Sequence, residues 1–98
     1  MYFNEISGKN LEQNLDAYSI FDVRSREEYS WGHVKGAINI PYDEILSHLD
    51  EIDRDADTVL YCRTNRRSEH AAKSLMAAGF ENVAIAPGVD LYDYDLVQ

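Results

Sequence analysis

The only cysteine of the chain, Cys62, stands at a position where a thiol could do chemistry. An apolar run over residues 58–61 precedes it, and a helical pattern follows Ser68. Cys62 is therefore predicted at the end of a buried strand, at the sheet edge where open α/β proteins bind ligands. Amides of such a turn favour negative charge, so we expect the thiol to ionise more readily than a free cysteine and to act as a nucleophile.

The turn that follows Cys62 is strongly basic. Residues 62–73 contain four basic side chains and one acidic one, whereas the rest of the chain contains five basic and seventeen acidic ones. A local positive site in a protein of net charge −9 suits a small anion, and it disfavours nucleic acid and anionic membranes as partners. A cysteine that only fills the core is the alternative, which three nearby arginines argue against (Arg63, Arg66 and Arg67).

The length of 98 residues predicts one domain, residues 1–98, and no apolar run approaches membrane-spanning length. The first twenty residues carry charged and amide side chains and do not read as a signal peptide. One cysteine fits a reducing compartment, so we expect a cytoplasmic protein. No cofactor is expected, and no metal either, because the three histidines are dispersed without ligand spacing (His33, His48 and His70).

Short apolar segments alternate with helical patterns along the whole chain. This alternation predicts an α/β fold with a mainly parallel sheet covered by helices on both faces. Strands are expected at 2–6, 18–23, 37–40, 58–61 and 83–86, and helices at 8–15, 26–31, 43–52 and from the Cys62 turn to about residue 79.

Three segments together resemble the rhodanese homology family of single-domain sulfurtransferases. They cover residues 21–29, 32–41 and 59–68, in the order and spacing of that family. The resemblance implies a five-stranded parallel sheet flanked by helices. It also implies that Cys62 opens a six-residue loop, residues 62–67, and carries sulfur as a persulfide.

The resemblance implies a thiosulfate sulfurtransferase. The donor would be thiosulfate or a persulfide, and the acceptor would be cyanide or a thiol such as glutathione or thioredoxin. Guanidinium groups match oxyanions, so Arg63 and Arg67 are the best candidates for holding the donor's sulfonate. Arg66 is expected to point outward. The remaining candidates are the loop residues Thr64 and Asn65, Ser68 as a helix cap or loop stabiliser, and Asp22 and Arg24 in supporting roles, with Arg24 expected to pair with Glu28.

Two positions depart from the family pattern. Asn65 stands where the family usually has glycine, and asparagine tolerates the left-handed backbone conformation that a tight loop needs. Near the C-terminus, Tyr92 is a candidate to replace the family's aromatic residue at the pocket mouth.

Two other functions compete with sulfur transfer. Cysteine phosphatases use Cys-x5-Arg, which would require arginine at position 68, where this chain has serine. The loop is therefore one residue too short for a phosphoryl group. A non-catalytic binding or sensor module is the second alternative, and the intact Cys62 loop argues against it.

Overall fold

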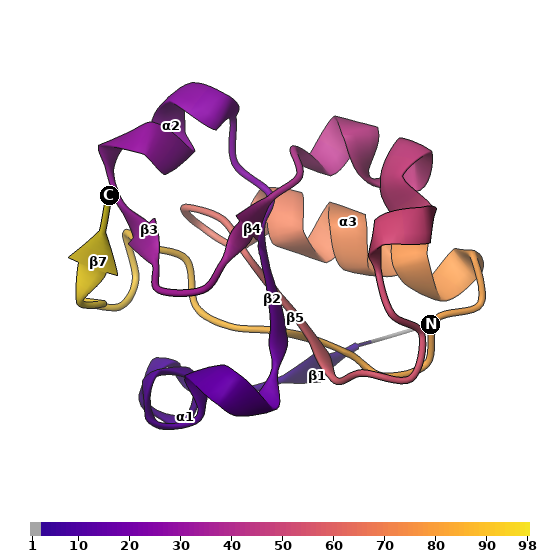
Figure 1. Cartoon of the computed structure of the whole chain (residues 1–98), viewed down its shortest axis with the longest axis horizontal. Helices are drawn as coiled ribbons and strands as arrows, with labels where there is room; N and C mark the ends of the chain where they lie inside the picture. The colour runs from indigo at the N-terminus through magenta and orange to yellow at the C-terminus, as the bar shows by residue number, and fades with distance from the viewer. Residues whose placement is uncertain (1–2) are drawn as a thin grey trace.

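The computed structural model describes residues 3–98 and contains a five-stranded, all-parallel sheet. The strands follow the order β1-β6-β5-β2-β4, which places β5 at the centre (Figure 1). This architecture confirms the predicted fold class. The expected first strand is shorter than predicted, and Tyr2 lies outside the described residues. The bounds are β1 Asn4–Glu5, β2 Ser19–Asp22, β4 Ile38–Asn39, β5 Thr58–Tyr61 and β6 Val83–Ile85.

Helices cover both faces of the sheet and create two apolar cores (Figure 1). On one face, α3 (Arg66–Ala77) and the 3-10 segment η2 (Tyr42–Glu51) pack over the sheet, and this core includes Cys62. On the other face, α1 (Gly8–Gln13), followed by the short 3-10 turn η1 (Leu15–Ala17), contributes Leu11. The central strand β5 is buried throughout because both of its faces are covered.

Two expected elements differ from the structure. The segment predicted as a helix over 43–52 forms 3-10 turns with a non-helical residue at His48. Because the 3-10 period differs from that of an α-helix, the predicted apolar stripe does not stay on one face, and Leu46 is exposed. The C-terminal segment also pairs with the chain: β7 (Leu96–Val97) forms an antiparallel ribbon with β3 (His33–Val34), which the sequence analysis missed.

The helix after the Cys62 turn matches its prediction closely. Its buried face carries Ala71, Ala72 and Leu75, and the chain leaves the helix through Gly79, whose φ of 97° is left-handed. Helix α2 (Arg26–Trp31) begins with the expected cap at Ser25. None of the helices within residues 3–98 is long and apolar enough to cross a membrane.

Candidate active site

Cys62 directly follows β5, so its thiol lies at the carboxyl edge of the central strand of the sheet. The side chain has no exposed surface. The backbone N–H of Ser68 donates to Cys62 Sγ at 3.4 Å, and the Ser68 hydroxyl oxygen lies 3.6 Å from the sulfur. The Ser68 N–H is thus a donor aimed at the sulfur, a contact that favours negative charge there, whereas the Ser68 hydroxyl oxygen accepts from the thiol.

The loop from Cys62 to Arg67 turns through Asn65, whose φ is 75°. This left-handed conformation is the one for which asparagine was expected to substitute for glycine, and the expectation is confirmed. The Asn65 side-chain oxygen accepts a hydrogen bond from Gly88 N at 2.9 Å, and its carbonyl accepts one from the Ser68 hydroxyl at 3.1 Å. Ser68 therefore stabilises the loop rather than capping α3 from the N-cap position.

The segment after β6 forms the floor of this loop. Val89 N donates to Cys62 O at 2.9 Å, and Asp90 N donates to Arg63 O at 3.1 Å. A Cβ atom on Gly88 would lie only 2.0 Å from the Arg63 carbonyl oxygen. Only glycine permits this close approach of two backbones.

Glu28 binds the last arginine of the loop. Two bonds join the Arg67 guanidinium to the Glu28 carboxylate, at 2.6 and 2.9 Å, and the glutamate side chain is only 12% exposed. The hydrogen bonds from Arg67 lower the pKa of Glu28 to about 2, although burial opposes the shift. Glu28 also accepts from Ser25 N in a capping box, so one carboxylate links the start of α2 to the loop.

Arg63 lies closer to solvent than Arg67. Its guanidinium donates to Asp90 at 2.9 Å and comes within 4.0 Å of Glu28, and its side chain is 52% exposed. The two arginines proposed for donor binding therefore both face carboxylates. A sulfonate that binds them has to compete with Asp90 and Glu28.

The expected pairing of Arg24 with Glu28 is wrong, because Arg24 pairs with Asp22. Both residues are buried, and the closest contact between guanidinium and carboxylate is 2.7 Å. Arg24 also donates to the carbonyl of Gly32 at 2.6 Å. Gly32 is the C-cap of α2, so this bond holds the C-terminal end of that helix. The supporting role of Asp22 and Arg24 stays a prediction; the contact with Gly32 links this pair to α2, the helix that carries Glu28.

The remaining loop residues are at the surface. Thr64 and Arg66 are exposed, and they line an open hollow with Arg67, Tyr42 and His70. His33 is not part of the site: its Nδ1 lies 3.0 Å from Tyr29 O, and its ring stacks on the Tyr29 ring. The Tyr92 expectation is wrong, because the Tyr92 ring packs against Gly8 of α1, on the sheet face away from the Cys62 core.

Three contributors were not among the predicted site residues: Glu28, Gly88 and Asp90. Glu28 carried a signal, since the spacing Ser25-x-x-Glu28 predicts a capping box, but that spacing does not show that the carboxylate also reaches position 67. Gly88 and Asp90 meet the loop through a packing contact between segments far apart in sequence, for which no local pattern exists.

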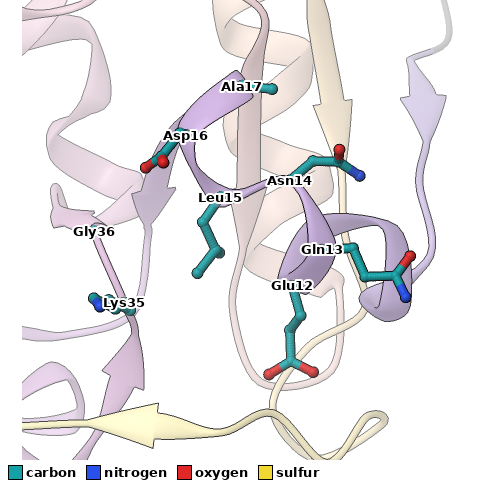
Figure 2. A pocket seen from close by; sticks show the side chains of 8 residues that line it. All are labelled: Glu12, Gln13, Asn14, Leu15, Asp16, Ala17, Lys35 and Gly36. Atoms are coloured by element: carbon teal, nitrogen blue, oxygen red, sulfur yellow. The ribbon is translucent and has the colours of Figure 1, made fainter.

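A second hollow, of about 540 Å³, lies between the α1–η1 segment and the connection from β3 to β4 (Figure 2). Glu12, Asp16 and Leu15 line one side, and Lys35 lies across from them. Residues 15–17 precede β2 and residue 36 precedes β4, so this hollow lies near the amino ends of parallel strands. Cys62 lies at the opposite edge, and the second hollow is therefore not the site of its chemistry.

Comparisons with known proteins agree with this geometry. The sequence model of the rhodanese-like domain family matches residues 7–88 of this chain. A sulfurtransferase from Allochromatium vinosum is 34% identical over 82% of this chain and 78% of its own, and the thiosulfate sulfurtransferase GlpE from Pseudomonas entomophila is 31% identical over 92% and 84%. A rhodanese-related protein from Thermoplasma volcanium superposes with a TM-score of 0.86 at 27% identity, over 97% of this chain and 98% of the other.

The chain belongs to the rhodanese-like family. It spans about half the length, 48%, of one further relative, a putative sulfur carrier protein YrkF from Bacillus subtilis, which is 34% identical over 87% of this chain. Several matched relatives are named sulfurtransferases, which supports a transferase.

Proposed function

We propose that this protein is a sulfurtransferase that moves sulfane sulfur from thiosulfate or a persulfide donor to a thiol or cyanide acceptor. The observation that carries the proposal is the thiol of Cys62 at the carboxyl edge of β5, held by Ser68 N at 3.4 Å inside a loop that contains three arginines. The relative named a thiosulfate sulfurtransferase supports thiosulfate as one donor. A reducing compartment such as the cytoplasm suits a single reactive thiol.

The reaction would proceed in two half-reactions. The Cys62 thiolate attacks the outer sulfur of thiosulfate, a sulfur–sulfur bond forms, and sulfite leaves with the electron pair of the broken bond. Cys62 then carries a persulfide anion. A second nucleophile attacks the terminal sulfur and releases the Cys62 thiolate, so charge and atoms balance in both steps. This covalent scheme predicts ping-pong kinetics.

The arginines would act on the donor. Arg63 is the more accessible of the two predicted sulfonate ligands, and Asp90 is its surface partner. Arg67 would reach a sulfonate only by sharing its donors with Glu28. Charge-assisted hydrogen bonds from guanidinium groups would favour an anionic donor over a neutral one.

The test is a Cys62→Ser variant. Because Cys62 is the only cysteine, treatment with thiosulfate followed by removal of the excess should add the mass of one sulfur atom to the native protein and nothing to the variant. Turnover should fall by at least about a thousandfold, since the nucleophile is lost.

The variant's circular dichroism and unfolding midpoint serve as controls that it is folded. Sulfur transfer by the serine variant at the native rate would refute the covalent mechanism. Hydrolysis of aryl phosphates by the native protein, faster than its sulfur transfer, would favour a phosphatase instead.

A further inference from the structure

An open hollow of about 520 Å³ adjoins the Cys62 loop, and its walls come from three elements. Tyr42 starts η2, Thr64 lies on the loop, and the other three residues lie on α3 (Arg66, Arg67 and His70). Residues four apart on a helix share a face, so the Arg66 guanidinium and the His70 imidazole lie on the same side of α3. The His70 ring meets the Tyr42 ring edge-on, with centroids 5.4 Å apart, and this contact orients the imidazole at the hollow.

Only some of the basic side chains around the loop form ion pairs within the protein. Arg63 and Arg67 form ion pairs with Asp90 and Glu28, whereas within residues 3–98 neither Arg66 nor His70 forms one. Arg66 is thus the loop guanidinium that an incoming anion can bind without displacing a carboxylate of the protein. Its planar fork matches a carboxylate, and His70 can add a further N–H donor.

A neighbouring hollow of about 280 Å³ shares Tyr42 and Arg67 with the first. Its other charged residues include Asp43 and the paired Arg26 and Glu44, whose closest contact is 2.7 Å. Positive charge that has no protein partner is therefore concentrated on the Arg66 side of the loop. The negative group of a bound molecule would therefore lie beside Arg66.

We propose that Arg66 and His70 form the binding site for the carboxylate of the acceptor, and that they select carboxylate-bearing thiols as acceptors over neutral ones. The proposal rests on the sulfur-transfer function proposed above. The acceptor thiolate attacks the terminal sulfur of the Cys62 persulfide, the sulfur–sulfur bond to Cys62 breaks, and the Cys62 thiolate leaves. The acceptor departs as a persulfide anion, and no oxidant or reductant is consumed.

The test isolates the second half-reaction. Protein loaded with sulfur, with loading measured by mass, is mixed with 2-mercaptoethanol, 3-mercaptopropionate or mercaptosuccinate, and the loss of the persulfide is followed in time. Rates are referred to the thiolate concentration of each acceptor, which removes differences in thiol acidity. The native protein should prefer the carboxylate-bearing thiols over 2-mercaptoethanol, and added salt should reduce the preference.

The variants Arg66→Gln and His70→Gln should lower the ratio of the mercaptosuccinate rate to the 2-mercaptoethanol rate. Because Arg66 and His70 are exposed, we expect a fall of about threefold in each single variant and about tenfold in the double variant. Lys9→Gln is the matched control: it removes one positive charge from α1, on the other face of the sheet, and should leave the ratio unchanged.

Three results separate the two proposals. A preference for carboxylates that falls in the Arg66 and His70 variants but not in Lys9→Gln supports the acceptor site. Efficient transfer with no such preference, or with a preference that the variants retain, overturns the acceptor site and leaves sulfur transfer standing. Failure of Cys62 to take up sulfur from any donor overturns the sulfur-transfer function, and the acceptor site with it.

Discussion

Asn65 contributes to the loop with both its backbone and its side chain. Its φ of 75° lets the chain turn back toward α3, and its side-chain oxygen binds Gly88 N at 2.9 Å. Glycine at this position would supply the conformation without the hydrogen bond. The asparagine therefore couples the loop to its floor, which a glycine could not do.

Replacing Asn65 should separate these two contributions. Asn65→Gly should cost about 1 kcal/mol of unfolding free energy, because it loses only the hydrogen bond. Asn65→Ala should cost about 2–3 kcal/mol, because it also places a Cβ in the left-handed region. Denaturant unfolding of both variants measures the difference, and equal stabilities would show that the backbone conformation is not limiting.

Single residues differed in how well the sequence predicted them. The tolerance of asparagine for a left-handed turn is an intrinsic property of that residue, so the sequence was enough to predict the conformation of Asn65. The partner of Arg24 was predicted wrongly because the prediction weighed a residue on α2 and overlooked Asp22, two positions earlier. Side chains two apart in extended backbone point the same way, which brings Asp22 and Arg24 together at the end of β2.

At the scale of elements, α2 acts as the support of the loop. Arg24 fixes its C-terminal end through Gly32, and Glu28 in its first turn holds Arg67. The sequence predicted the bounds of α2 and its cap, because both depend on local signals. It missed the β3–β7 ribbon, since strands of two residues are too short for an alternating pattern to be recognised.

The central strand β5 begins with a buried polar side chain, Thr58. The Thr58 hydroxyl is buried and has no hydrogen-bond partner within residues 3–98. Thr58→Val keeps the shape and removes this hydroxyl, so it should raise the unfolding free energy by about 1 kcal/mol. Thr58→Ser is the control, because it keeps the hydroxyl and loses the methyl group; it should destabilise. A less stable valine variant would show that the hydroxyl is satisfied in solution.

At the scale of the whole molecule, the fold brings a basic loop to one edge of an otherwise acidic protein. The sheet could be predicted as parallel because strands and helices alternate along the chain. The order of the strands, with β5 in the centre, could not, because it depends on which crossovers pack and not on any local pattern. That order places Cys62 between the carboxyl ends of β6 and β2, the two neighbours of β5. It also lets Glu28 and residues 88–90 reach the Cys62 loop.

The Glu28–Arg67 pair connects this site to the acid stability of the fold. The pKa of Glu28 falls from its ordinary value of 4.5 to about 2, chiefly through the hydrogen bonds from Arg67. The folded carboxylate thus has a lower pKa than the unfolded one, so the unfolded state binds the proton first as the pH falls. The stability that this pair contributes is complete above about pH 4.5 and is lost between pH 4.5 and 2.

Glu28→Gln should reveal this contribution. At neutral pH the variant should unfold with a free energy lower than the native value by on the order of 2 kcal/mol, after allowance for solvent screening at the partly exposed Arg67. The difference should shrink as the pH is lowered from 4.5 toward 2, because protonation removes the same charge from the native protein. Glu27→Gln is the control, since Glu27 also lies in the first turn of α2 but forms no ion pair within residues 3–98. Denaturant unfolding at several pH values measures both differences. A Glu28→Gln difference that stays constant down to pH 2 would mean that the carboxylate charge does not hold the loop, and that Glu28 acts only as a cap of α2.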